Sequence, residues 1–300
     1  MKKIKAFLNK NSHWVLLSPF LICFTVFILL PVLCAVVLSF TQYDTVQTPR
    51  FIGLENYISI FTRDRDFMQY VLPNTITYAL VVGPGGYLLS FLLAWLLSQL
   101  SKWPRTVLAI IIYLPSTLGA AALTVVWGVI FSGDRAGYLN NLLLSLKVIE
   151  QPILWLTSPD TLMPIMIVVG LWSSMGVGFL AMLSGVLNVN PELYEAAAID
   201  GVHSRLQEIY YVTLPAVKPQ MLFGAVMAIV NTFNSPGMGV ALSGTNPTPH
   251  YAGQLIVNHM DDYGFLRYEM GYAAALSVIL LILVWMSSRV AYRLFGEKDD

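Results

Sequence analysis

The residues best suited to chemistry in this chain form one acidic, small-residue segment, Glu195-Ala196-Ala197-Ala198-Ile199-Asp200-Gly201. Glu195 can form charge-assisted hydrogen bonds with a basic group, and such bonds are stronger than neutral ones. The alanines beside it are strong helix formers with almost no side chain, so another surface can approach the helix closely. This combination predicts non-covalent docking of a partner and no catalysis.

The flanking residues predict two short helices that hold this segment in place. Asn190 is a favourable N-cap, because its side-chain oxygen can accept a free amide of the first turn. Gly201 supplies the left-handed conformation that ends the first helix, so we expect it at positive φ. A second helix is expected over residues 204–211. Leu214 and Pro215 are then expected to break that helix and redirect the chain.

These helices would join two apolar segments of a chain that is embedded in a membrane. Of its 300 residues, 56% are hydrophobic and only 11% are charged, whereas a soluble domain carries about 25% charged residues. Crossing the hydrocarbon core takes roughly 20 apolar residues. The segments that qualify are 14–40, 71–100, 106–131, 161–187, 219–242 and 270–294. The sequence therefore predicts an all-α membrane protein with six transmembrane helices.

The distribution of basic residues predicts the orientation of these helices. Lysine and arginine concentrate on one side if the N-terminus is cytoplasmic, as expected for short loops. Residues 1–13 and 295–300 are then cytoplasmic termini, and residues 14–294 form one six-span membrane domain. The loop at 188–218 also falls in the cytoplasm. The expected location is the cell membrane, crossed several times, with both termini inside.

No pattern in the chain predicts ATP binding, a metal site or an ion-driven carrier. The phosphate-loop motif Gly-x-x-x-x-Gly-Lys-Ser/Thr is absent, and no charged residue lies deep in an expected span, where ion-coupled carriers usually place one. His250, His259, Asp261 and Asp262 lack metal-site spacing, and we expect them on a solvated outer loop. The 17 basic and 17 acidic residues cancel, so no nucleic-acid partner is indicated. Energy for transport would come from a partner.

Two clusters of mostly polar and aromatic side chains interrupt the apolar spans on either side of the loop. The members are Trp172, Ser173, Ser174 and Val177 before the loop, and Asn231, Thr232, Asn234 and Ser235 after it. Unpaired polar groups that face lipid are costly, so these residues are candidates for lining the path of a polar solute. Small hydroxyl residues also mediate close helix packing, and that alternative stands, above all for the serines.

The loop resembles the cytoplasmic EAA loop of ABC importer permeases, in which Glu-Ala-Ala, three residues and Gly precede a hydrophobic-x-Leu-Pro. The matching positions are Glu195, Ala196, Ala197, Gly201, Leu214 and Pro215, with Asp200 beside the glycine. Gly137-x-x-Asn140-x-x-Leu143, Trp172 and the run from Gly271 to Ser277 are similar to the maltose and multiple-sugar branch. The resemblance implies a type I ABC importer permease fold, with the loop forming cytoplasmic coupling helices that dock on an ATPase subunit.

Departures from the family pattern bear on geometry. The stretch from Gly201 to Pro215 is one residue longer than the commonest spacing, so we expect a rotated or bulged second coupling helix. Gly244-Thr245-Asn246-Pro247 stands where sugar permeases often have a Gly-Gly-Gly-Pro turn near the binding protein. By the same resemblance, the helix segments around Trp172 and Asn234 line a cavity near mid-membrane. Val177 there replaces an aromatic residue found in some relatives.

The resulting hypothesis is a permease subunit of an ATP-driven ABC importer for a sugar or oligosaccharide. The resemblance implies a second permease subunit, an ABC ATPase dimer and an extracellular solute-binding protein as partners, within membrane lipid. The chain itself would catalyse nothing and bind no cofactor, since ATP and Mg belong to the partner ATPase. Two alternatives stay open. One is an ABC permease for another polar solute, and the other is an intramembrane enzyme.

Overall fold

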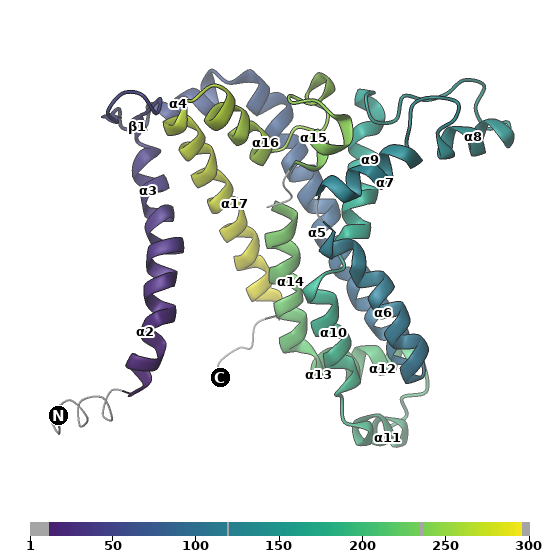
Figure 1. Ribbon diagram of the computed structural model, residues 1–300. Helices are drawn as coiled ribbons and strands as arrows, with labels where there is room; N and C mark the ends of the chain where they lie inside the picture. Colours follow the sequence, from purple (N-terminus) through teal and green to yellow (C-terminus); the bar gives the residue numbers. More distant parts are fainter. Residues whose placement is uncertain (1–11, 119, 234–236, 296–300) are drawn as a thin grey trace. The chain divides into compact units, whose positions relative to one another are not determined.

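The computed structural model describes residues 12–118, 120–233 and 237–295, and their regular structure is almost entirely helical (Figure 1). The strands β1 (Thr41–Gln42) and β2 (Arg50–Phe51) have two residues each and pair antiparallel. The predicted all-α class is therefore confirmed. The chain divides into two compact units. The smaller unit comprises the chain up to Arg63 together with Tyr263–Ile279, and the larger comprises Asp64–Asp262 and the chain from Leu280 onward.

The helices before β1 are α2 (Ser12–Phe24), the π turn η1 (Thr25–Leu29) and α3 (Leu30–Leu38). The elements after β2 are α4 (Glu55–Thr62), η2 (Phe67–Val71), α5 (Leu72–Ser98), α6 (Lys102–Thr117), α7 (Ala120–Ile130), α8 (Tyr138–Ser145), α9 (Pro159–Ser173), α10 (Val177–Leu187), α11 (Pro191–Ile199), α12 (Arg205–Glu208), η3 (Ile209–Thr213), α13 (Leu214–Ala216), α14 (Lys218–Phe233), α15 (Met238–Ser243), η4 (Pro249–Tyr251), α16 (Ile256–Asp261), η5 (Asp262–Leu266) and α17 (Met270–Phe295). Of the η elements, η4 is a 3₁₀ turn and the others are π turns.

The first helix of the smaller unit is apolar on all sides. Leu16–Leu38 has a mean hydropathy of 3.0, and 0% of its most apolar window is buried inside the protein. A helix that is hydrophobic all round needs an apolar environment. An apolar environment such as lipid must therefore surround this helix.

The start of α17 packs backbone to backbone against the β1 region of the same unit. The Gly271 amide donates to the Tyr43 carbonyl at 3.2 Å, and a Cβ on Gly271 would collide with the Thr41 backbone. The buried Asn56 amide also donates to the carbonyls of Ser39 and Thr41, at 2.8 and 2.9 Å. The glycine that begins the Gly271–Ser277 run is thus required for space.

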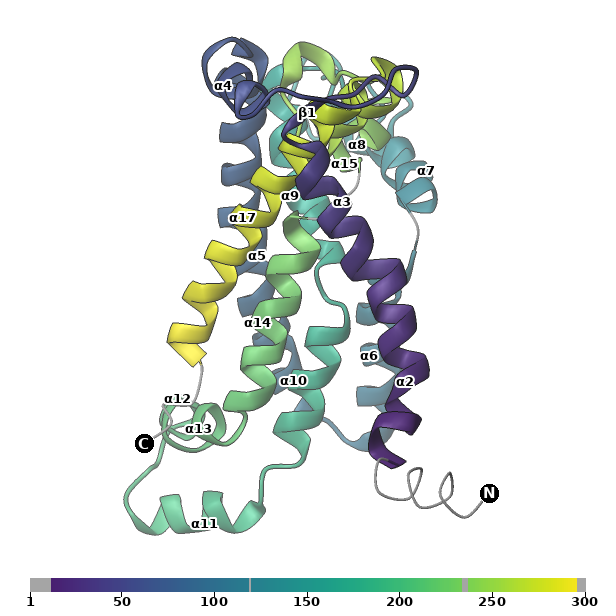
Figure 2. The same cartoon turned by 90° about the vertical axis from the view of Figure 1, so that its left-hand side faces the viewer.

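The larger unit is built on α5, α9, α10 and α14, with α10 and α14 side by side in both views (Figures 1 and 2). One buried cluster contains Tyr78, Val82, Phe131, Leu162, Ile165, Met166, Val169, Leu242 and Leu255, and a second contains Ala94, Leu97, Met175, Phe179, Met182 and Leu183. A Cβ on Gly178 would lie 3.1 Å from the Gly224 Cα. Small residues therefore bring α10 and α14 into backbone contact, as is common between membrane helices.

The described helices correspond to the expected spans, except that three of those spans are broken into two helices each. Leu16–Leu38, Phe67–Ser98 and Met270–Leu294 are long and apolar enough to cross a membrane, and two bent helix pairs also qualify. The pair α9 and α10 bends by 43°. The expected third span, 106–131, is divided into α6 and α7, since Leu118 is extended with ψ 133°. The expected fifth span, 219–242, is divided into α14 and α15.

Candidate functional site

The first helix of the candidate coupling loop, α11, begins and ends as the sequence predicts. The Asn190 side chain accepts a hydrogen bond from the Glu192 amide at 3.1 Å. Gly201 has φ +94°, and the Val202 amide donates to the Ala197 carbonyl at 2.9 Å, which makes a Schellman end. A Cβ on Gly201 would meet nothing within 4 Å. Backbone conformation, and not lack of space, therefore requires glycine at this position.

The second helix of the loop contains a π turn. Ser204 and Gln207 form a reciprocal capping box at the start of α12. The helix then passes into η3, where the Leu214 amide donates to the Ile209 carbonyl five residues earlier. A π turn accommodates one additional residue within a helix. This agrees with the expected bulge and with the longer spacing between Gly201 and Pro215.

The expectation that Leu214 and Pro215 redirect the chain is wrong. Both residues lie in α13, which continues helically from η3, and the axis instead bends by 83° between Ala216 and Lys218. Pro215 occupies the first turn of α13. Proline removes one backbone N–H donor from this continuous helical stretch, but the helix continues past it to Ala216.

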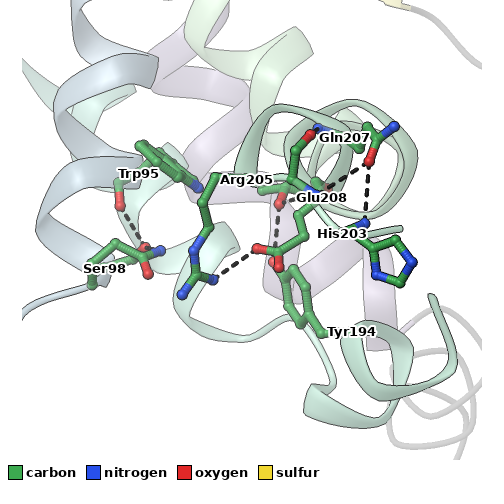
Figure 3. Close-up of polar contacts among 10 residues, drawn as sticks. Trp95, Ser98, Tyr194, His203, Arg205, Gln207 and Glu208 are labelled. Atoms are coloured by element: carbon green, nitrogen blue, oxygen red, sulfur yellow. Dashed lines mark hydrogen bonds and ion pairs between the residues drawn. The ribbon is translucent and has the colours of Figure 1, made fainter. Parts of the chain in front are cut away.

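A buried hydroxyl pair joins the two helices of the loop (Figure 3). The Tyr194 hydroxyl lies 3.0 Å from Thr213 Oγ1, and Thr213 is fully buried in the π turn. Thr213 Oγ1 donates to the Glu208 carbonyl at 3.3 Å, so Tyr194 can donate to Thr213. Arg205 and Glu208 form an exposed ion pair at 2.8 Å. The hydroxyl pair therefore fixes where α11 lies relative to η3.

The outward surface of the loop is apolar as well as acidic. Glu195, Ala196 and Asp200 are exposed, as expected for a docking surface. The side chains of Ile199 and Leu206 are 87% and 78% exposed. These two residues and Tyr194 were not predicted as site residues. In a membrane protein, residue type alone does not indicate whether an apolar side chain faces lipid, the protein interior or a partner.

Two of the predicted path residues, Trp172 and Asn231, lie beside residues that were not predicted to line the path. Trp172 is 36% exposed and meets Trp127 edge to face, with ring centroids 5.1 Å apart. Asn231 is exposed beside Gly176, at the break between α9 and α10. A Cβ on Gly176 would lie 4.0 Å from Asn231 Nδ2 and 3.6 Å from Ser116 Oγ. Polar groups therefore gather where the bent helix pair is interrupted.

Two other predicted path residues lie in helix contacts. The Ser174 hydroxyl donates to the Leu171 carbonyl at 2.7 Å, and the side chain packs on Gly86. Thr232 is buried and donates to the Ala228 carbonyl at 2.7 Å. These two contacts support the packing alternative.

The remaining predicted path residues divide by exposure. Ser173 Oγ is buried without a hydrogen-bond partner among the residues that the structure describes, and Val177 is exposed. Asn234 and Ser235 lie outside the described residues.

The expectation of a solvated loop around His259 is wrong. The His259 side chain is 2% exposed, and its Nε2 lies 2.8 Å from Oδ2 of the equally buried Asp64. Asp262 is also buried, and partial burial raises the pKa of the Asp261 carboxyl above its ordinary value. No group of His, Cys, Asp or Glu in the described residues is suited to hold a metal ion. The pair instead joins the start of η2 to α16.

Asn140 organises the loop that carries α8. Its buried amide donates to the carbonyls of Ser132, Asp134 and Ile153 at 3.0, 3.1 and 3.0 Å. Its Oδ1 accepts from the Ile153 amide at 3.1 Å and from Trp155 Nε1 at 2.8 Å. The asparagine of the Gly-x-x-Asn motif therefore ties both ends of this loop to the start of α8.

A family model described as "binding-protein-dependent transport system inner membrane component" matches residues 86–295. The chain belongs to this family. It is therefore a transport permease of the inner membrane that crosses the bilayer several times, as its apolar helices require. The match includes the candidate coupling loop, both halves of the α9–α10 pair and all of α17.

Relatives match the permease over nearly its whole length. The probable ABC transporter permease protein YesP of Bacillus subtilis (strain 168) is 31% identical, over 98% of this chain and 93% of its own. The arabinooligosaccharides transport system permease protein AraP of the same strain is 28% identical, over 96% and 90%. The lactose transport system permease protein LacF of Rhizobium radiobacter is 27% identical, over 98% and 97%.

Two solved structures share the fold. A bacterial alginate ABC transporter in complex with alginate pentasaccharide-bound periplasmic protein has a TM-score of 0.79 at 20% identity, over 98% of each chain. A bacterial ABC transporter involved in the import of the acidic polysaccharide alginate has a TM-score of 0.76 at 23% identity, over 97% of this chain and 99% of its own. The predicted ABC importer permease fold is confirmed.

Proposed function

We propose that this permease is one membrane subunit of an ABC importer that takes up a sugar or an oligosaccharide. The support is that relatives named for arabinooligosaccharide and lactose transport match it over at least 90% of their own length. We further propose a second permease subunit and an extracellular solute-binding protein as partners. A fold neighbour was solved with a periplasmic protein that carries a pentasaccharide.

The observation that carries the coupling role is the exposed surface of α11 and α12. Glu195 offers a carboxylate to a basic group, Ile199 lies four residues on along α11, and Leu206 is an exposed apolar residue of α12. Large exposed apolar side chains beside a polar rim mark protein interaction sites. An ATPase subunit that covers this surface would bind ATP and Mg and hydrolyse the nucleotide, and the permease would catalyse nothing.

The connections of the loop indicate how docking would move the cargo path. The loop joins α10 directly to α14, and the break between α9 and α10 lies at the other end of α10. A displacement of the loop would therefore reorient the helices beside Trp172 and Asn231, which are candidates for sugar contacts. Rigid-body motion of packed elements is a common form of such switching.

Serine substitutions of Ile199 and Leu206 test the coupling role. Fully burying a leucine side chain contributes about 1.5–3 kcal/mol, so each variant should bind the ATPase roughly tenfold more weakly or worse. Leu146→Ser is the matched control, because Leu146 is 62% exposed on the loop after α8. ATPase affinity is measured on detergent-purified permease. If both variants bind the ATPase with wild-type affinity, Ile199 and Leu206 do not contribute to the contact with the ATPase.

The cargo is tested separately with the complete transporter in proteoliposomes. Uptake is compared for labelled arabino-oligosaccharides, lactose, an amino acid and inorganic phosphate, each with the cognate binding protein present. We expect ATP-dependent uptake of a carbohydrate. Uptake of the amino acid or of phosphate, with none of any sugar, would make the permease a transporter of another polar solute.

A further inference from the structure

Four exposed side chains form one stripe along α17. Leu281, Trp285, Arg289 and Arg293 follow one another at intervals of four residues, and residues four apart share a helix face. The Arg289 guanidinium lies over the Trp285 ring, with Cζ 4.9 Å from the ring centroid. The stripe therefore changes from apolar to aromatic to basic toward the end of the helix.

A surface hollow lies at the basic end of the stripe. It has a volume of about 460 Å³ and is lined by Trp285, Ser288, Arg289, Tyr292 and Arg293. Among the residues that the structure describes, all that line the hollow belong to α17, so this part of the chain leaves the hollow open on the side away from the helix axis. The described part of the chain supplies no acidic partner to either arginine. The hollow offers guanidinium and hydroxyl donors to an anion from the surroundings of the protein.

The length of α17 sets the depth of this hollow in the bilayer. Met270–Leu294 is apolar enough to cross a membrane, with a mean hydropathy of 2.1. At 1.5 Å per residue, the helix rises about 27 Å from residue 270 to residue 288, close to the roughly 30 Å hydrocarbon core. Arg289 and Arg293 then lie at the headgroup level. Trp285 lies in the interface, where tryptophan is enriched, and Leu281 lies among the acyl chains.

We propose that this stripe binds one anionic phospholipid. Arg289 and Arg293 hold the phosphodiester, Trp285 packs against the glycerol region, and an acyl chain lies along Leu281. Guanidinium groups match phosphate geometry with paired donors. A zwitterionic headgroup also carries a phosphate, but its ammonium offsets the charge, so a net negative headgroup is preferred. This site rests on the membrane location of the chain and is independent of the proposed cargo.

The test compares phosphatidylglycerol with phosphatidylcholine on the full-length, detergent-purified permease. Dissociation constants are measured by native mass spectrometry. Each basic residue near a membrane surface contributes about 1 kcal/mol to binding of anionic lipid. Arg289→Gln or Arg293→Gln should therefore weaken phosphatidylglycerol binding about fivefold, and the double variant about 30-fold. Phosphatidylcholine binding should hardly change. Arg50→Gln with Arg135→Gln removes the same charge from exposed outer positions and should have no effect.

Three results would overturn the proposal. The first is wild-type phosphatidylglycerol affinity in a double variant that has the wild-type unfolding temperature. The second is displacement of phosphatidylglycerol by inorganic phosphate at the same concentration as the lipid, which would show that the hollow binds a free anion and not a lipid. The third is loss of copurifying ATPase or second permease from the double variant in both lipids, which would make the stripe a protein contact. Trp285→Leu provides a further check, since it keeps the charge and should weaken the binding of both lipids.

Discussion

Gly201 and Gly271 both belong to family motifs, but the structure requires glycine at them for different reasons. Gly201 has φ +94° and open space around its missing Cβ. Gly271 lies against the Thr41 backbone, where any side chain would collide. The left-handed region is costly for residues with a Cβ, whereas a collision excludes any side chain. A substitution that tolerates positive φ should therefore rescue the first position only.

Gly201→Val should reach the membrane normally but lose most transport. The left-handed conformation costs an ordinary residue about 1–2 kcal/mol, and a β-branched residue resists it further, so the end of α11 would rearrange. Gly201→Asn should retain much of the activity, since asparagine enters this region more readily. Uptake is measured in proteoliposomes at matched permease content.

Gly53→Val is the matched control for this prediction. Gly53 has φ +63° and equally open surroundings, but it belongs to the smaller unit, whereas the candidate coupling loop belongs to the larger one. The same backbone strain there should leave ATPase coupling intact. Equal uptake by Gly201→Val and wild type, or equal loss in the Asn and Val variants, would contradict a conformational role for Gly201.

At the scale of elements, α11 depends on its attachment to η3. A helix of nine residues is marginal alone, because isolated helices shorter than about 12–15 residues are unstable in water. The Tyr194–Thr213 contact supplies a tertiary anchor and passes any movement of α11 into the π turn. The π turn precedes the 83° bend into α14. The hydroxyl pair therefore links the proposed docking surface to α14, in addition to the direct chain connection from α11 back to α10.

Tyr194→Phe should reduce the amount of sugar imported per ATP hydrolysed, while ATPase binding persists. One neutral hydrogen bond contributes about 0.5–1.5 kcal/mol, which corresponds to a loss of coupling of a few fold to about tenfold. Uptake and phosphate release are measured in the same proteoliposomes. Tyr210→Phe removes an exposed hydroxyl with no hydrogen bond among the described contacts and serves as the control. An unchanged ratio in Tyr194→Phe would show that the pair only packs.

The features predicted correctly depend on residues close together in the sequence. The Asn190 cap and the Gly201 stop use contacts within a few positions, so residue type alone indicates them. The Tyr194–Thr213 pair spans 19 residues, and the His259–Asp64 pair spans 195. Such contacts depend on how helices pack, which residue type does not specify. For the same reason, Ser174 looked like a path residue but packs on α5.

At the scale of the whole molecule, the elements of the larger unit define two ends. α11 and the start of α6 lie at one end, and α8 and α15 lie at the other (Figures 1 and 2). The distribution of lysine and arginine predicts that the first end is cytoplasmic. The proposed ATPase contact requires the same orientation, although it rests on different residues.

Cysteine labelling in sealed cells tests this orientation. After replacement of both native cysteines, a single cysteine at Asp134 or Thr245 should react with a membrane-impermeant maleimide. A cysteine at Asp200 or Lys102 should react only after the membrane is permeabilised. Labelling is read from the mass shift of the purified permease. External labelling at Asp200 would invert the topology and exclude the proposed docking of an ATPase there.

The contact between Gly178 and Gly224 has a mechanical consequence. It places the backbones of α10 and α14 against each other near the start of α10, and the Met182 side chain of α10 packs on Gly224 beside this contact. These two helices hold the two ends of the coupling loop. We therefore expect α10 and α14 to move together as one body, so that a displacement of the loop would be transmitted to the α9–α10 break.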